Sequence, residues 1–264
     1  MRGWVGLDTL KNETSSKVIK NMLWPKKSKA WIKLLSLVYL KVLPLHGLDK
    51  NWKQILCKET AFNMTDPGYC NSKDGPKWTN EDLKAIQSKI RQKLPNPETP
   101  HDYSFYGEPS NTNLFPKIIR GELEHWRIWE DKDHVAFLTL FPNTPGFTVL
   151  VPRKPLPSDI FSLGKEDYMS IVHAAQKVGK VLLDSLDARG IAIIFEGFEI
   201  DYAHVKLIPV LSSEKCTSGK SDYDKVRKNV FFESYQGYVT SINGPKATDA
   251  DLDNMYQQII DFNK

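Results

Sequence analysis

Two short apolar runs, separated by a turn rich in proline and glycine, constrain the fold of this chain more than any other feature of the sequence. Residues 135–141 (VAFLTLF) form the first run, residues 142–146 (PNTPG) the turn, and residues 147–151 (FTVLV) the second run. Apolar runs of this length, bounded by turn formers, are typical of buried strands. Because so short a turn leaves no room for a crossover connection, the pattern predicts an antiparallel hairpin.

The hydrophobic period changes after the hairpin. Apolar residues recur at helical spacing over residues 166–186, which predicts an amphipathic helix of about five turns that ends near Gly190. Residues 191–195 and 203–208 follow as two further strands, and the short connection between them predicts that they are neighbours. Strands, then a helix, then strands predict an α+β fold in which helices pack on an antiparallel sheet.

The last predicted strand carries polar side chains at every second position. Tyr202, His204 and Lys206 alternate with apolar residues, so they share one face of the strand while the apolar set faces the helix-covered core. An acidic loop at residues 196–201 directly precedes this strand. A histidine on a strand is more often structural than catalytic, so the pattern by itself indicates only a candidate polar site.

The charge distribution divides the chain into two parts. Residues 1–110 carry 18 basic and 11 acidic side chains, whereas residues 111–264 carry 18 and 21. Residues 95–112 contain four prolines in the manner of a linker. We therefore expect a basic, partly helical N-terminal extension at 1–110 and a domain at 111–264 with a helical C-terminal extension. A basic segment is compatible with a nucleic-acid partner, but a solvated tail explains the charge equally well.

Compartment and membrane association follow from simple counts. The apolar stripe within residues 31–43 indicates a helix that docks on the following domain or lies on a membrane surface, and docking is favoured because the stripe carries only two lysines. No run of eighteen apolar residues exists, so no membrane span is expected. Three cysteines without a C-x-x-C pair favour a reducing compartment, and thus an intracellular, cytoplasmic protein without a cysteine zinc site.

Three blocks of sequence resemble the histidine-triad (HIT) family of nucleotide-binding proteins. They are LFPKIIRGE at 114–122, WEDKDHVAFLTLFPNTPGFTVLVPRK at 129–154 and AHVKLIP at 203–209, and the similarity extends over residues 113–211 in the order and spacing of the family. The resemblance implies the HIT α+β fold, a nucleotide ligand and a homodimer.

The last block departs from the family signature, in which three histidines alternate with apolar residues. Here the three positions are Tyr202, His204 and Lys206. In family enzymes the central histidine attacks the α-phosphate of a nucleotide and forms a nucleotidyl-histidine, which water then hydrolyses. The resemblance therefore implies that His204 is the nucleophile, that Lys206 holds a phosphate oxygen, and that Tyr202 donates one hydrogen bond.

The resemblance also places a nucleotide-binding region, with several substitutions. Thr139 stands where an Asp or Asn usually meets the ribose, Phe198 replaces a phosphate-binding Gln or Ser, and the turn before Gly197 is shortened to Glu196, which would repel phosphate. Asn143 lies in the turn of the hairpin and completes the expected set. Together the substitutions suggest that the common purine-nucleotide site has drifted.

Two further parts of the chain bear on the site. Asn113 and Pro116 occupy positions that some family members fill with zinc-binding cysteines, so we expect neither a metal nor another cofactor. Residues 223–264 resemble the C-terminal extension of some HIT-like proteins with an altered triad. In this extension Tyr235 and Tyr238 are candidates for stacking on a base, although core aromatics are the simpler explanation.

Two classes of function follow from these observations. The first is a nucleotide hydrolase or transferase that acts through His204, and the retained central histidine favours it. The second is a catalytically weakened nucleotide-binding or scaffolding module, which the loss of the neighbouring donors favours. A role in processing nucleic-acid ends remains a third hypothesis, supported only by the basic N-terminal segment.

Overall fold

The computed structural model describes residues 40–43, 53, 55–212 and 231–262. Most of them, within the range Leu45–Pro245, form one compact unit, and the helix α6 (Asp249–Phe262) belongs to a second unit that we describe separately. The apolar stripe within residues 31–43 lies almost entirely outside the described residues. No helix in the described part of the chain combines the length and the apolar character that crossing a bilayer requires.

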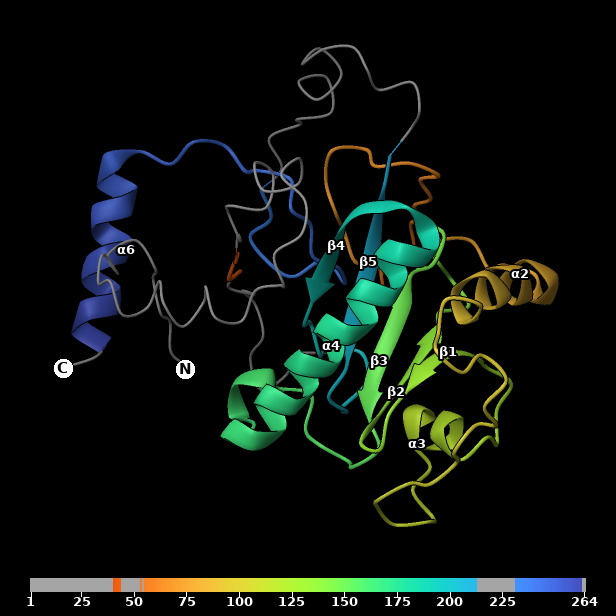
Figure 1. Cartoon of the computed structure of the whole chain (residues 1–264). Helices are drawn as coiled ribbons and strands as arrows, with labels where there is room; N and C mark the ends of the chain where they lie inside the picture. Colours follow the sequence, from red (N-terminus) through yellow and green to blue (C-terminus); the bar gives the residue numbers. More distant parts are fainter. Residues whose placement is uncertain (1–39, 44–52, 54, 213–230, 263–264) are drawn as a thin grey trace, which may run out of the picture. The chain divides into compact units, whose positions relative to one another are not determined.

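A five-stranded antiparallel sheet forms the centre of the larger unit, in the order β1-β2-β3-β5-β4 (Figure 1). This confirms the predicted α+β fold, the predicted hairpin of β2 and β3, and the predicted pairing of β4 with β5. The strands are β1 (Trp126–Glu130), β2 (His134–Leu138), β3 (Thr148–Pro152), β4 (Ala188–Ile194) and β5 (Val205–Leu211).

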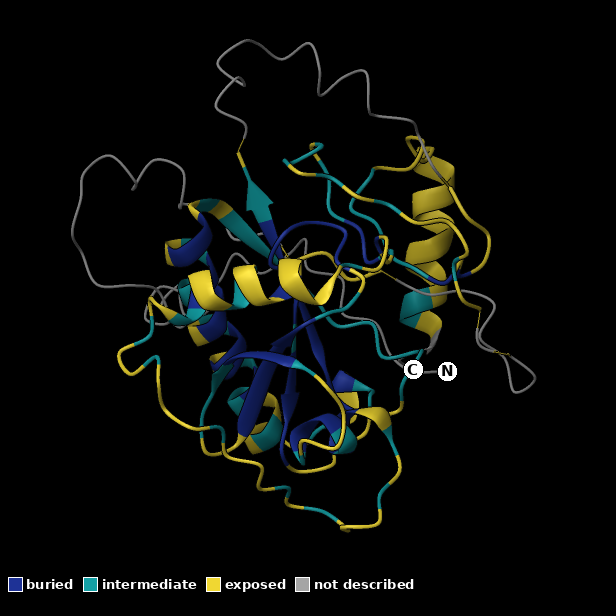
Figure 2. Cartoon of the chain, turned by 90° about the vertical axis from the view of Figure 1, so that its right-hand side faces the viewer, coloured by how far each residue is buried: buried dark blue, intermediate teal, exposed yellow. Residues whose placement is uncertain are grey.

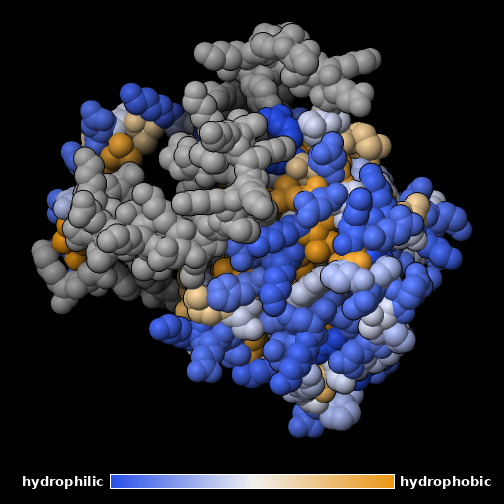
Figure 3. Space-filling view, viewed as in Figure 1, coloured by the Kyte–Doolittle hydropathy of each residue, from blue (hydrophilic) through white to orange (hydrophobic). Residues whose placement is uncertain are grey.

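Helices cover both faces of the sheet. The long helix α4 (Lys165–Leu186) and the helix α2 (Asn80–Arg91) lie on one face, and the short helix α3 (Leu114–Ile119) lies on the other. A one-turn helix, η1 (Ile160–Ser162), precedes α4. Figure 2 shows that the central strands β2 and β3 are mostly buried, whereas the edge strand β4 is intermediate to exposed. The surface around α4 is largely hydrophilic with smaller apolar areas (Figure 3).

The helix α4 ends earlier than the sequence suggests. It stops at Leu186, and Asp187 follows in the left-handed conformation with φ of 52°. β4 then begins at once, with Ala188, so the predicted end near Gly190 falls inside the strand. Aspartate tolerates this conformation better than most residues, and it therefore serves as the C-terminal cap in place of the glycine.

The helix α2 does not belong to a separate extension. Thr79 caps it by accepting a hydrogen bond from the backbone N of Asp82 at 3.2 Å. Leu83 and Ile90 then enter the same hydrophobic core as α4 and the sheet. The boundary predicted between residues 110 and 111 thus lies within one compact unit, because these side chains need the sheet to bury their apolar surface.

Leu83→Ala tests this packing. The substitution is expected to destabilise the whole domain by about 2–5 kcal/mol, because it leaves a cavity under α4. Urea unfolding followed by circular dichroism should show one transition at a lower midpoint. Lys84→Ala, at an exposed position of the same helix, is the control and should leave the midpoint nearly unchanged. An unaltered transition in Leu83→Ala would mean that α2 folds apart from the sheet.

The helix α6 confirms that the C-terminal extension is helical. Thr248 caps the helix through its hydroxyl group, which accepts a hydrogen bond from the backbone N of Asp251 at 3.2 Å. Leu252 and Tyr256 of this helix have largely exposed side chains.

Candidate functional site

Along β5 and the residues just before it, side chains alternate between the two faces of the sheet, as the strand period of two predicts. Ala203, Val205 and Leu207 pack into the core beneath α4. Tyr202 packs with α3 on the opposite face. The register pairs Lys206 with Val149 of β3 and with Ile194 of β4, which places Lys206 in the interior of the sheet.

The ring of His204 is held by one backbone contact. Its Nδ1 lies 2.8 Å from the carbonyl oxygen of Tyr202. Since a carbonyl only accepts, Nδ1 carries the proton and donates, which leaves the lone pair on Nε2. Among the described residues Nε2 has no hydrogen-bond partner. The imidazole is 7% exposed and lies 5.2 Å, centroid to centroid, from the ring of Phe115.

The surroundings of His204 keep it neutral. Burial lowers the pKa of the imidazole because it disfavours the charged form, the hydrogen bond to the carbonyl of Tyr202 opposes this effect, and the nearby ammonium of Lys206 lowers the pKa further. At neutral pH the ring is therefore an uncharged base with one free nitrogen. This is the state that attack on an electrophile requires.

Tyr202 does not take the role that the resemblance implies. Its hydroxyl donates a hydrogen bond of 2.7 Å to the carbonyl oxygen of Pro152, and the side chain is 2% exposed. Burial raises the pKa of the phenol. The ring packs against Phe115, so Tyr202 serves as a core residue. The strand pattern placed it on the correct face, but only the tertiary structure shows where its hydroxyl group points.

Tyr202→Phe is therefore expected to act on stability alone. Loss of the buried hydrogen bond should cost about 1 kcal/mol, with a further penalty for the carbonyl of Pro152 that loses its partner. Any activity that depends on His204 should stay within a factor of about two, because the ring and the backbone carbonyl of residue 202 are retained. Thermal unfolding and a parallel activity assay check the two parts, and a large loss of activity without unfolding would return Tyr202 to the site.

Lys206 is paired with the acidic residue that precedes it in the hairpin. Its Nζ donates to Oε2 of Glu196 at 2.9 Å, and the two side chains are 11% and 2% exposed. The other carboxylate oxygen of Glu196 accepts a hydrogen bond from the hydroxyl of Tyr235 in the C-terminal segment. The expected free cation is thus neutralised by a residue that the sequence had identified only as repelling phosphate.

The other sequence-predicted residues have structural partners. The amide of Asn143 donates to the backbone carbonyls of Asn71 and Lys73, each at 2.9 Å. Gly197 has φ of 74°, and a side chain at this position would place Cβ 2.7 Å from the carbonyl oxygen of Ser158. Both residues therefore have roles in holding loops, which sequence spacing alone does not reveal.

Thr139 and Phe198 are the remaining two residues that the sequence predicted for the site. Thr139 follows β2, and its hydroxyl accepts a hydrogen bond of 3.2 Å from the backbone N of Phe141. The ring of Phe198 lies 5.2 Å from that of Tyr235. Tyr235 therefore packs on an aromatic side chain of the protein, in the position where stacking on a base was considered. The structure brings Glu196, Lys206, Phe198 and Tyr235 together, and it gives Thr139 a local backbone partner.

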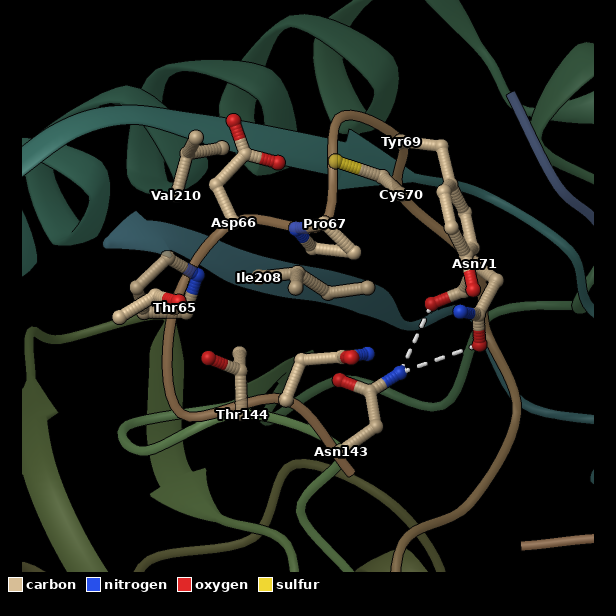
Figure 4. A pocket seen from close by; sticks show the side chains of 12 residues that line it. Thr65, Asp66, Pro67, Tyr69, Cys70, Asn71, Asn143, Thr144, Ile208 and Val210 are labelled. Atoms are coloured by element: carbon tan, nitrogen blue, oxygen red, sulfur yellow. Dashed lines mark hydrogen bonds between the residues drawn. The ribbon is translucent and has the colours of Figure 1, made fainter. Parts of the chain in front are cut away.

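A small pocket lies farther along the same face of β5. Ile208, two residues beyond Lys206, forms part of its lining, together with the loop at residues 63–71 and the turn that contains Asn143 (Figure 4). Its volume of about 20 Å³ matches roughly one water molecule, which is far less than a nucleoside needs. The pocket therefore shows how closely the loop covers this end of the sheet.

A serine, a histidine and an aspartate form a second polar chain at the turn between β1 and β2. His134 Nδ1 lies 3.1 Å from Oδ1 of Asp131, and its Nε2 lies 3.5 Å from Oγ of Ser170. The same Oδ1 of Asp131 also accepts the backbone N–H groups of Asp133 and His134. This chain caps the turn, because the carboxylate is committed to backbone donors and His134 is buried.

The larger unit thus combines an antiparallel sheet with a buried histidine on the face opposite α4, beside Phe115 of α3. Residues 120–209 match the family model of the HIT domain. The chain is 34% identical over 71 residues to an uncharacterized HIT-like protein from Synechocystis, with 27% of this chain and 61% of that protein covered. Residues 120–209 are thus similar to the HIT domain.

Further relatives share the same region. The chain is 24% identical over 101 residues to the protein named hit from Bacillus subtilis, with 36% of this chain and 69% of that protein covered. A crystal structure of a member of the HIT family from Bacillus subtilis is 20% identical, with a TM-score of 0.39, and the alignment covers 57% of this chain and 96% of that one.

Proposed function

We propose that this protein binds a nucleotide and that Nε2 of His204 attacks the α-phosphorus of a nucleoside phosphate ester, phosphoramidate or dinucleoside polyphosphate. The new bond joins Nε2 to phosphorus, and the leaving group departs with the electron pair of its own bond to phosphorus and takes up a proton. Water then attacks the same phosphorus, releases the nucleoside monophosphate and restores the imidazole.

One observation supports this proposal above all others. His204 has its Nδ1 proton fixed by the carbonyl of Tyr202, whereas Nε2 has no partner among the described residues. Together with the lowered pKa, this provides a neutral nucleophile of fixed tautomer at physiological pH. Lys206 is the cation next to it on the strand, and it can stabilise a phosphate oxygen as a point charge once its pairing with Glu196 is relaxed.

The test is a single-turnover experiment that traps the covalent intermediate. The full chain is mixed with an α-labelled diadenosine polyphosphate or an adenosine phosphoramidate, quenched, and analysed for protein-bound label. Label that is stable in base and labile in acid, as expected for a phosphorus–nitrogen bond to histidine, would support the proposal. Complete absence of label under conditions in which nucleotide binds would contradict it.

A second candidate function has its own supporting observation. Lys206 is paired with Glu196, and the hydroxyl of Tyr202 is bonded to Pro152, so neither neighbour of His204 offers a free donor. A nucleotide-binding or scaffolding module without turnover fits this arrangement. In that case nucleotide raises the melting temperature through linkage, but no product forms and no label is trapped.

Assembly and location are part of the same proposal. β4 forms one edge of the sheet, and its Ile193 is largely exposed, which is compatible with the homodimer that the resemblance implies. Light scattering coupled to size-exclusion chromatography tests the dimer, and fractionation tests the proposed cytoplasmic location.

A nucleic-acid partner for the basic N-terminal residues is left as a separate hypothesis, which a binding titration at two salt concentrations would test.

A further inference from the structure

The pairing of Lys206 involves three parts of the chain. Lys206 comes from β5, Glu196 from the loop after β4, and Tyr235 from the C-terminal segment. One oxygen of the Glu196 carboxylate faces the ammonium and the other accepts from the phenol. Because both oxygens are engaged and the side chain is 2% exposed, the carboxylate is fixed beside the cation.

Several carboxyl groups lie near the ammonium group of Lys206. Burial raises the pKa of both Asp74 and Glu199, and in each case the ammonium of Lys206 opposes this effect while the carboxylate of Glu196 adds to it. Three carboxyl groups therefore share the surroundings of one ammonium. A phosphate that approaches Lys206 would come next to the carboxylate of Glu196 and near the other two carboxyl groups.

The C-terminal segment is firmly attached where it holds Glu196. Thr240 pairs with Asn71 in an antiparallel bridge, and the ring of Tyr238 lies beneath Nζ of Lys73 at 4.3 Å. Gly237, with φ of 82°, passes so close to the carbonyl of Ile55 that an added Cβ would lie 2.6 Å from that oxygen. Tyr235 therefore cannot leave Glu196 without a movement of the surrounding segment.

We propose that Glu196, held in place by Tyr235, determines the charge of the ligand that the His204 face accepts. With the pair intact, Lys206 is neutralised, so the site discriminates against ligands that present a doubly negative phosphate to it. Glu196 is the specificity-determining residue and Tyr235 is its positioning residue. This inference rests on the proposed function, since it concerns the charge of the ligand at the same site.

The test compares AMP with adenosine, which has the same base and ribose but no charge, by isothermal titration. Glu196→Gln is expected to raise the affinity for AMP at least about tenfold relative to adenosine, because a like charge next to the phosphate is removed and Lys206 becomes available. Tyr235→Phe keeps the charge but releases the carboxylate, and a smaller gain of about two- to fivefold is expected.

Two controls isolate the cause. Glu108→Gln removes the same charge from an exposed position and should leave both affinities unchanged. The double variant Glu196→Gln/Lys206→Met lacks the cation as well, so the gain for AMP should disappear. Circular dichroism and thermal unfolding establish that each variant is folded, and Tyr235→Phe provides the test if Glu196→Gln does not fold.

The possible results separate this inference from the proposed function. An AMP-to-adenosine ratio that is unchanged in the folded variants, or a gain that persists in the double variant, would overturn the role of Glu196. If Glu196→Gln binds AMP more tightly by the expected factor but acquires no label on His204 in the single-turnover experiment, the role of Glu196 stands and nucleotidyl transfer is refuted. A gain together with faster labelling would support both.

Discussion

His204→Ala is expected to reduce the formation of protein-bound nucleotidyl label by at least about a thousandfold, because the variant has no nucleophile at this position. The fold should survive, since the side chain is at the edge of the core beside Phe115 and its one hydrogen bond is to a local carbonyl. Quench-flow measurement of label in the wild type and the variant, at equal nucleotide occupancy, gives the ratio directly.

His173→Ala is the matched control for this substitution. His173 is exposed on α4, so its removal should leave both labelling and stability unchanged. If His204→Ala is folded, binds nucleotide and still becomes labelled at a similar rate, another group is the nucleophile and the assignment of His204 is refuted.

The pH dependence of labelling provides a further check of the same residue. The pKa of His204 lies below its ordinary value of 6.5, so the neutral, nucleophilic form predominates at pH 6.5 and above. The midpoint of the fall in labelling rate should therefore lie below pH 6.5. A midpoint at or above pH 6.5 would mean that the imidazole is more basic than its surroundings indicate.

Glu130→Gln is expected to have the largest effect on stability, a loss of about 3–5 kcal/mol. Oε2 of Glu130 accepts from Arg127 at 2.8 Å and from Arg153 at 2.6 Å, and both guanidinium side chains are completely buried. Removal of the carboxylate charge leaves two buried cations that keep backbone carbonyls as acceptors, and only Arg153 retains a carboxylate nearby, that of Asp102 at 3.7 Å. Urea unfolding at pH 7 measures the loss.

The same carboxylate makes stability depend on pH. Burial alone would raise the pKa of Glu130, but the hydrogen bond from His101 and the charges and hydrogen bonds of Arg127 and Arg153 outweigh it and lower the pKa from 4.5 to about 2. The stabilisation is thus complete above pH 4.5 and is lost as the pH falls toward 2. At about 1.4 kcal/mol for each pH unit, the difference amounts to about 3 kcal/mol.

Comparison of variants assigns this pH dependence to Glu130. Glu130→Gln should lose less stability than the wild type between pH 4.5 and pH 2, because it lacks the group that titrates. Glu122→Gln removes the partner of Arg120, but that carboxylate is 46% exposed, so the expected loss is below about 1 kcal/mol. An identical acid transition in the wild type and Glu130→Gln would refute the role of this network.

The two arginines also show a limit of sequence analysis. Arg127 and Arg153 are both fully buried, and each donates to the backbone carbonyl of Asp102, so they attach the segment around residues 101–104 to the sheet. In the sequence they appear as ordinary charged residues near strand ends. No local pattern distinguishes these buried arginines from exposed ones, because the carbonyl of Asp102 that both contact lies 25 and 51 residues away.

The sequence by itself determined the fold class, the order of the main elements and the face of β5 that carries His204. These features depend on local periodicity, since a period of two or of 3.6 fixes which side chains share a face wherever the element lies. The candidate nucleophile was identified in this way, together with the family resemblance of its strand. The caps of α2 and α6 are equally local features, because capping involves residues only three positions apart.

The tertiary structure alone decided what the polar side chains do. It directs the hydroxyl of Tyr202 to Pro152, pairs Lys206 with Glu196, and brings Tyr235 across 39 residues to the same carboxylate. It also places α2 in the central core rather than in a separate extension. The physical reason is the same in each case: the partner of a buried polar group and the cover of an apolar face are set by chain segments distant in sequence, which no local pattern encodes.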